Sequence, residues 1–157
     1  MNEDELNLLL NASPMHDIGK IGISDSMLLK ASPLEPEEWE IMKKHAQIGA
    51  NILSGDDSPM MKMAREIALT HHEKWDGSGY PNGLKGEGIP LVGIISALAH
   101  VFDALMSSRP YKKNWNIEET IEFIKNNSGI HFDPQLVEYF IKHIDDIIEI
   151  RNKYSDS

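Results

Sequence analysis

One long apolar segment, residues 89–107, constrains the fold more than any other feature of the sequence. Its opening at residues 91–95 would also suit a β-strand. Apolar residues then continue at helical spacing through Ala97, Leu98, Val101, Phe102, Ala104 and Leu105. Because this spacing persists to the end of the segment, we predict one mostly buried helix over the whole of it.

The other apolar residues also repeat at helical spacing. They predict helices over residues 5–11, 37–53, 60–72, 117–125 and 133–150. Asn2 is expected to cap the first of these, and Asn116 with Glu119 forms a capping-box pattern before the fourth. Five glycines and a proline at residues 75–88 predict a loop. The fold class predicted is therefore all-α.

Length and composition indicate one ordinary globular domain. The 157 residues show no internal repeat and no long linker, so we treat residues 1–157 as a single domain. There is no cysteine, which excludes disulfides and thiolate metal sites and suits a reducing compartment. No apolar run approaches the roughly 20 residues of a membrane span, and residues 1–5 are too acidic for a signal peptide. We expect a cytoplasmic protein without a membrane partner.

The charge of the chain limits its partners. A net charge of −10 argues against binding to long nucleic acid, which requires a basic surface. A small phosphorylated ligand remains compatible with this charge, because a few cations in one pocket act locally.

Polar residues that carry metal chemistry interrupt the predicted helices. His16 and Asp17 are adjacent, His45 lies within an apolar helical face, and His71 and His72 end another helix. A single histidine of this kind is usually a hydrogen-bonded core or helix-end residue. Four histidines and an aspartate at element ends and inner faces favour a metal cluster instead, since imidazole with carboxylate suits zinc, iron or manganese.

Three segments then show a specific resemblance: HDIGKIGI at residues 16–23, HHEKWDGSGYP at 71–81 and VFDAL at 101–105. With shorter matches at 83–84, 86–90, 109–112 and 131–134, the chain resembles the HD-GYP family of bacterial cyclic-di-GMP phosphodiesterases from about residue 8 to residue 140. The resemblance implies an HD-domain-like helical bundle with a glycine-rich GYP loop. It also implies two or three divalent metal ions, usually iron or manganese, and hydrolysis of cyclic di-GMP to linear pGpG or GMP.

The resemblance assigns roles residue by residue. It implies metal ligands at His16, Asp17, His45, His71 and His72. Asp17 would bridge two ions, and Asp17 with Lys20 would form the catalytic pair. Substrate contacts are implied for Lys20, Tyr80, Asp103, Arg109 and Lys112. Bound metals would activate water and polarise the phosphoryl oxygens.

The sequence also departs from the family pattern. His100 stands where the family has an aspartate ligand, so its imidazole is the candidate replacement, and Ile94 stands where a family arginine is usual. The family's first metal histidine lies upstream of His16, and the fifteen residues before His16 are too few to hold it. We therefore expect the chain to lack the family's N-terminal helices. We also expect one well-held metal, bound by Asp17, His45, His71 and His72, and a second, weakened site.

Three classes of function stay open at this stage. The first is the metal-dependent phosphodiesterase, with a sensor domain, a receiver domain or a diguanylate cyclase as partners of the kind the family has. The second is a degenerate module that binds nucleotide or a protein without hydrolysis. The third is hydrolysis of another nucleotide or phosphate ester. The oligomeric state is not predicted.

Overall fold

The computed structural model describes residues 1–107 and 113–155, and the regular elements in these ranges are all helical. The fold class predicted from the sequence is confirmed. The first helix, α1 (Glu3–Ala12), begins as expected at Asn2: its side chain accepts from the Glu5 backbone N–H, and the Glu5 carboxylate accepts from the Asn2 backbone N–H. A short turn and the 3₁₀ helix η2 (Ile18–Gly22) follow.

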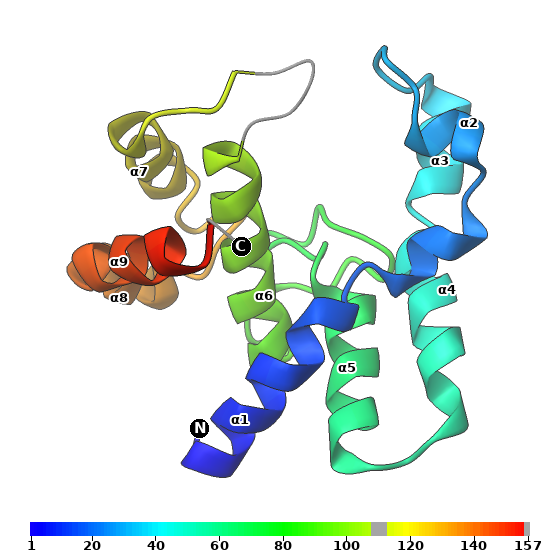
Figure 1. The fold of residues 1–157 in the computed structure, drawn as a ribbon, viewed down its shortest axis with the longest axis horizontal. Helices are drawn as coiled ribbons and strands as arrows, with labels where there is room; N and C mark the ends of the chain where they lie inside the picture. Colours follow the sequence, from blue (N-terminus) through cyan, green and yellow to red (C-terminus); the bar gives the residue numbers. More distant parts are fainter. Residues whose placement is uncertain (108–112, 156–157) are drawn as a thin grey trace.

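Figure 1 shows the arrangement of the remaining helices. Helices α4 and α5 pack against each other, α5 also contacts α1 and α6, and α6 contacts α7. Helices α7, α8 and α9 lie together on the opposite side of α6 from α4. The bounds are α2 (Asp25–Leu28), α3 (Pro36–Met42), α4 (His45–Ile52), α5 (Pro59–Thr70), α6 (Leu91–Met106), α7 (Ile117–Asn126), α8 (Pro134–Lys142) and α9 (Ile144–Ser155).

Two of the predicted helices are broken in the structure. Residues 37–53 contain α3 and α4, which separate at Lys43 and Lys44, where the Lys44 N–H donates to the Ile41 carbonyl three residues back. Residues 133–150 form α8 and α9, separated by His143. The second break directs α9 so that Ile144 and Ile147 pack against the core instead of continuing past it. Apolar residues continue at helical spacing across both breaks, so the sequence pattern could not predict either of them.

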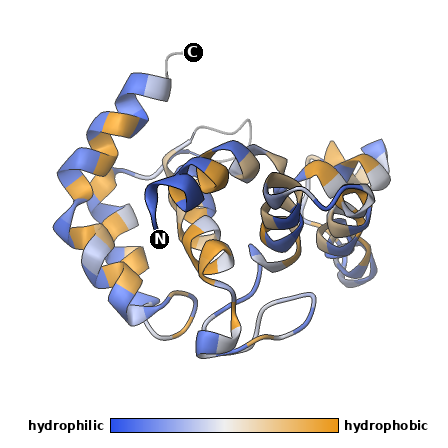
Figure 2. Cartoon of the chain, turned by 90° about the horizontal axis from the view of Figure 1, so that it is seen from below, coloured by the Kyte–Doolittle hydropathy of each residue, from blue (hydrophilic) through white to orange (hydrophobic). Residues whose placement is uncertain are grey.

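Helix α6 joins two hydrophobic clusters. Its first turn contributes Val92 to a cluster with α1 and α5, and its later turns contribute Leu98 and Phe102 to a cluster with α7 and α8. Figure 2 shows orange and blue stretches along the same helices, as expected of amphipathic elements. The central, mostly buried helix predicted from residues 89–107 is confirmed as α6.

Within the described residues, we find no helix of the length and apolar character that crossing a membrane requires.

Candidate metal centre

His16 and Asp17 are placed where α1 ends and η2 begins. The turn after α1 allows His16 Nδ1 to donate to the Ser13 carbonyl at 2.8 Å, and Asp17 is the residue before η2. Gly19 lets η2 lie directly on α4: a Cβ at this position would come within 1.8 Å of the His45 carbonyl oxygen. Only glycine fits there, so the HDIG sequence has a packing reason as well as a chemical one.

His45 and His71 are oriented in the same way. His45 Nδ1 lies 2.7 Å from the Met42 carbonyl, and His71 Nδ1 lies 3.0 Å from the Ile67 and Ala68 carbonyls. A carbonyl only accepts, so Nδ1 carries a proton in each ring, and in the neutral ring Nε2 keeps its lone pair. Backbone contacts of this kind orient histidine ligands in metal sites.

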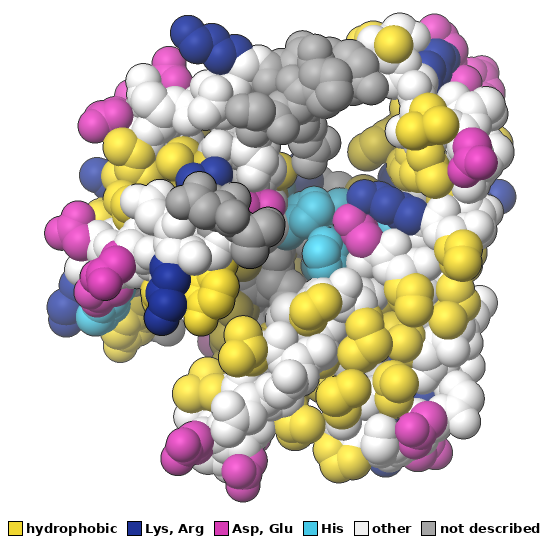
Figure 3. Space-filling view, in the orientation of Figure 1, with side chains coloured by type: hydrophobic (Ala, Val, Ile, Leu, Met, Phe, Trp, Pro, Cys, Tyr) yellow, Lys and Arg dark blue, Asp and Glu magenta, His cyan; other side chains and the backbone are white. Residues whose placement is uncertain are grey.

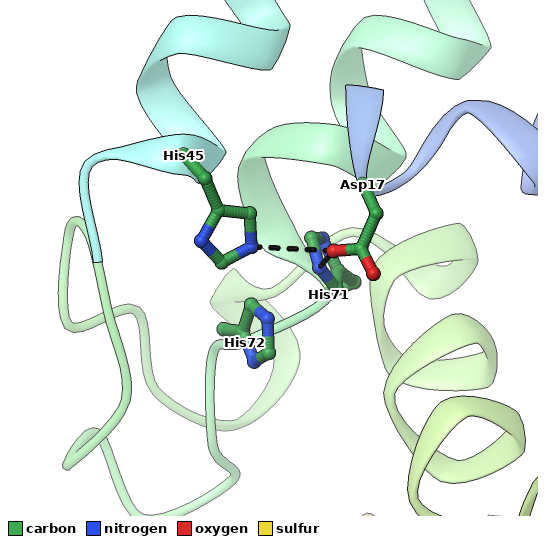
Figure 4. Close-up of side chains that lie close together, drawn as sticks. All are labelled: Asp17, His45, His71 and His72. Carbon is green, nitrogen blue, oxygen red and sulfur yellow. Dashed lines mark ion pairs between the residues drawn. The ribbon is translucent and has the colours of Figure 1, made fainter. Parts of the chain in front are cut away.

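Asp17, His45, His71 and His72 converge on one point (Figure 4). One potential ligand atom from each lies within 4.8 Å of the others, and we call these residues the four-residue group. Nε2 of His45 and of His71 lie 3.4 and 3.5 Å from Asp17 Oδ1. All three atoms are buried without a hydrogen-bond partner. Lone pairs that face a carboxylate oxygen across this distance need a cation between them, so the residues fit a divalent metal ion.

A second group lies beside the first. His16, Asp17 and His100 also offer ligand atoms within 4.8 Å of one another, and we call them the three-residue group. Asp17 belongs to both groups, through Oδ1 toward His45 and His71 and through Oδ2 toward His16 at 3.3 Å. The arrangement therefore suits two adjacent ions that share one carboxylate.

The carboxyl group of Asp17 is ionised, which suits a ligand shared by two metal ions. Burial alone would raise the pKa of this carboxyl, but its contacts with His16, His45, His71 and Lys20 hold the pKa well below its usual range. The contact with Asp17 in turn raises the pKa of His16 above its ordinary value. Asp17 is thus an anion at neutral pH, as a metal ligand must be.

His72 and His100 are neutral because burial disfavours their charged forms. Burial lowers the pKa of His72 to about 2, with His71 and His45 adding to the effect. Burial also lowers the pKa of His100 to about 4. Both rings therefore offer lone pairs without first having to release a proton.

The groups face a hollow in the surface. Figure 3 shows histidine side chains at its floor, near the middle of the face and next to acidic and basic side chains. A pocket of about 480 Å³ lies against the groups and is lined by His71, His72, Tyr80, His100, Trp39, Lys43, Lys74 and His131, among others. The sequence did not indicate the last four of these. Trp39 lies on α3, and Lys43 lies at the break between α3 and α4, which the periodicity did not predict.

Aromatic side chains form one wall of this pocket. Tyr80 stacks on His72 with ring centroids 4.7 Å apart, and Trp39 meets Tyr80 edge to face at 6.2 Å. Lys43 Nζ lies 5.9 Å from the centre of the Tyr80 ring. Cations beside aromatic rings that line a pocket are a combination that suits a phosphorylated ligand with aromatic bases.

The loop that carries Tyr80 is anchored by a buried carboxylate. Glu73 is 1% exposed, and its two oxygens accept from the backbone N–H groups of Asn82 and Leu84 at 2.8 and 3.0 Å. Gly79 allows the loop to fold back, because a Cβ there would come within 2.4 Å of the Lys74 nitrogen. The sequence prediction missed Glu73, although its place in HHE after two candidate ligands was the available signal.

Of the other predicted substrate contacts, Lys20 and Asp103 lie near the three-residue group, whereas two others lie outside the described residues. Lys20 Nζ donates to Asp17 Oδ2 at 2.7 Å, which places its charge at the edge of the three-residue group. Asp103 lies on α6, one turn after His100, and lines a smaller pocket with His16. Arg109 and Lys112 lie outside the described residues, and their roles stay predictions. Ile94 is buried in α6 and lines a different pocket, with Trp75 and Glu87.

Sequence comparison identifies the family. The sequence model described as HD domain matches residues 1–136. The chain belongs to the HD domain family. An HD domain implies divalent-metal binding, and the two groups offer candidate ligands for it.

Named relatives of this HD domain agree with the HD-GYP resemblance. It is 49% identical over 154 residues to the 3'3'-cGAMP-specific phosphodiesterase 2 of Vibrio cholerae, covering 98% of this chain and 30% of the relative. It is 51% identical over 145 residues to a cyclic di-GMP phosphodiesterase of Thermotoga maritima, covering 92% and 39%. The chain thus spans about a third of the length of these curated relatives.

A solved structure shares the fold. The crystal structure of a V. cholerae cyclic GMP-AMP phosphodiesterase, V-cGAP3, matches with a TM-score of 0.65 and 22% identity, over 96% of this chain and 41% of that one. At this identity the match supports the all-α HD-domain fold.

Proposed function

We propose that this HD domain hydrolyses a phosphodiester bond of a cyclic dinucleotide, with cyclic di-GMP as the substrate and linear pGpG or GMP as the product. One observation carries the proposal: two candidate metal-ligand groups share Asp17 and face one pocket that contains cations and aromatic rings. The names of relatives at 42 to 51% identity, several of them cyclic di-GMP phosphodiesterases, support the choice of substrate.

The four-residue group is the stronger candidate for a tightly held ion. It offers four ligands, and two of its imidazoles are already oriented by backbone carbonyls. Both groups share Asp17, but the three-residue group offers one ligand fewer, so its ion would be held less firmly. We propose iron(II) or manganese(II) as the ion of the four-residue group, since both accept imidazole and carboxylate. Bound divalent ions supply Lewis-acid polarisation of phosphoryl oxygens and lower the pKa of bound water.

Side chains around the groups would bind and orient the substrate. Lys20, Lys43 and Lys74 place positive charge around the groups and their pocket, where it would attract the phosphate oxygens. Trp39 and Tyr80 offer ring faces or edges to guanine bases. Lys20 also holds the Asp17 carboxylate in position through its 2.7 Å hydrogen bond.

The direct test is anaerobic incubation of the chain with cyclic di-GMP and iron(II) or manganese(II), with chromatography of the products. We expect linear product in the presence of metal and none after chelation. Asp17→Asn is the inactive control, because it removes the shared ligand. Absence of product with metal bound would leave a nucleotide-binding module without hydrolysis as the function.

A second substrate is favoured by one specific finding. The relative that is 49% identical over 98% of this chain is named a 3'3'-cGAMP-specific phosphodiesterase. The two cyclic dinucleotides differ in one base. The metal groups would contact the phosphates, which both share, and the Trp39 and Tyr80 side of the pocket would contact the bases and discriminate between them. Parallel assays with both substrates compare their kcat/KM values, and the larger value identifies the substrate class.

A further inference from the structure

The two ligand groups are unusually poor in carboxylate. Together they contain five imidazoles and one carboxylate, and that carboxylate, Asp17, is shared. Two divalent ions at the centre would therefore meet a single protein anion. The three-residue group contributes two of its three ligands, His16 and His100, as neutral nitrogen donors.

His100 has the position and freedom of a ligand. It lies on α6, between the buried residues Leu98 and Phe102, so its backbone is fixed by the core. Its ring centroid is 5.1 Å from that of His16 and 5.5 Å from that of His72. Among the described residues no hydrogen bond holds its ring, unlike those of His16, His45 and His71. A buried structural histidine would normally have such a partner, whereas a ligand leaves a nitrogen for the metal.

The chemistry of the donors sets the preference of the site. Imidazole suits zinc(II) and iron(II), whereas manganese(II) binds preferentially to carboxylate and other oxygen ligands. A shared carboxylate gives each ion only part of one negative charge, which weakens the binding of an ion that depends on anionic oxygen. Both groups share this carboxylate, but the three-residue group has one ligand fewer. Manganese(II), which gains least from imidazole, is therefore held less firmly there than in the four-residue group.

We propose that His100 makes the three-residue group a site for zinc(II) or iron(II) that excludes manganese(II) under conditions where the four-residue group accepts it. The inference deepens the proposed function, because it concerns the second ion of the same centre. It requires metal binding by these residues and does not require that any particular nucleotide be hydrolysed.

Metal stoichiometry of the intact chain tests this preference directly. Bound zinc(II) is measured by mass spectrometry of elements after dialysis, and bound manganese(II) by the loss of the free-ion electron paramagnetic resonance signal. We expect about two equivalents of zinc(II) and about one of manganese(II) per chain. Two tightly bound manganese(II) ions in the unsubstituted chain would overturn the proposal, and this comparison needs no variant.

Substitutions identify His100 as the cause. His100→Asp supplies a second carboxylate, so bound manganese(II) should rise from about one to about two equivalents, with at least a roughly tenfold gain in affinity at the second site. His100→Ala should lower bound zinc(II) from about two equivalents to about one. Unchanged zinc(II) in His100→Ala would show that His100 is not a ligand and would overturn the proposal.

His131→Asp is the matched control. His131 lines the same pocket but belongs to neither group, so this variant adds a carboxylate near the centre without placing it among the ligands. It should leave manganese(II) at about one equivalent. A second manganese(II) ion in His131→Asp would attribute the effect to charge rather than to ligation and would overturn the assignment.

Different results would contradict the metal preference of the three-residue group and the hydrolysis of a cyclic dinucleotide. If the stoichiometries are as expected but neither cyclic dinucleotide is hydrolysed, the preference of the metal site stands and the proposed function fails. If hydrolysis occurs while the unsubstituted chain binds two manganese(II) ions tightly, the function stands and the role of His100 fails.

Discussion

At the residue scale, the centre depends on how each side chain is held. His16, His45 and His71 all donate Nδ1–H to a backbone carbonyl, which leaves Nε2 for another partner. In two of them that nitrogen is buried and unpaired, opposite the unpaired Asp17 Oδ1. Buried polar atoms without partners are rare, and three that face one another suit a bound cation.

Asp17 is the residue whose loss should affect both ions. Asp17→Asn keeps the shape of the side chain but removes the charge that both groups share, so metal content after dialysis should fall below about a tenth of an equivalent per chain. Asp103→Asn is the control, because Asp103 lies one turn after His100 and belongs to neither group. Elemental analysis of both variants measures the difference. Retention of one full equivalent by Asp17→Asn would show that the groups do not share this ligand.

The sequence could predict the ligands better than their surroundings. His16, Asp17, His45, His71 and His72 were all expected, since each lies in a recognisable pattern, and the structure brings them together. The His100 substitution was also visible in the sequence. The tautomers were not predictable, because they depend on carbonyls whose direction is fixed only once the helices end.

At the element scale, helix ends and the glycine-rich loop build the site. The prediction of one helix over residues 37–53 was wrong, because α3 and α4 separate at Lys43 and Lys44. Trp39 on α3 and Lys43 at this break both line the pocket. Apolar periodicity cannot reveal such a break, because the core contacts continue on both sides of it. The loop at residues 75–88 was predicted correctly, but its anchor, Glu73, was not.

Glu73 should determine where that loop lies. Glu73→Gln replaces one accepting oxygen with an NH₂ group that faces a backbone N–H, so we expect a loss of about 1–3 kcal/mol in the free energy of unfolding. Chemical denaturation measures this loss. We also expect weaker binding of cyclic dinucleotide, because Tyr80 lies in the released loop. Glu87→Gln is the matched control, since Glu87 is exposed in the same loop, and equal losses in the two variants would contradict the anchoring role.

At the scale of the whole molecule, the site lies between two hydrophobic clusters that α6 connects. The α1, α4 and α5 side supplies most of the ligands, α6 supplies His100, and the segment between α7 and α8 supplies His131 to the pocket. The all-α fold followed from periodicity, caps and glycines in the sequence. The packing of α7 to α9 against α6 did not, because it depends on contacts between distant segments.

The stability of the metal-free molecule should depend on His131. Burial lowers the pKa of His131 to about 4, below the ordinary value of 6.5 that applies in the unfolded chain. The unfolded chain therefore takes up this proton first as the pH falls. The contribution of neutral His131 is fully present above about pH 6.5 and is lost as the pH falls toward 4, by at most about 3 kcal/mol.

Denaturation of His131→Asn at pH 8 and pH 5 measures this contribution. Acidification should destabilise the unsubstituted chain more than the variant. His143→Asn is the control, because the His143 side chain is 54% exposed. An equal response to pH in the unsubstituted chain and in His131→Asn would exclude the contribution.

Asp17 should join two metal sites in this domain. Anomalous X-ray diffraction from crystals grown with zinc(II), recorded on both sides of the zinc absorption edge, locates bound ions without reference to activity. We expect two neighbouring peaks, each beside an oxygen of Asp17, one toward His45, His71 and His72 and the other toward His16 and His100. Peaks elsewhere on the chain, with none beside Asp17, would contradict it.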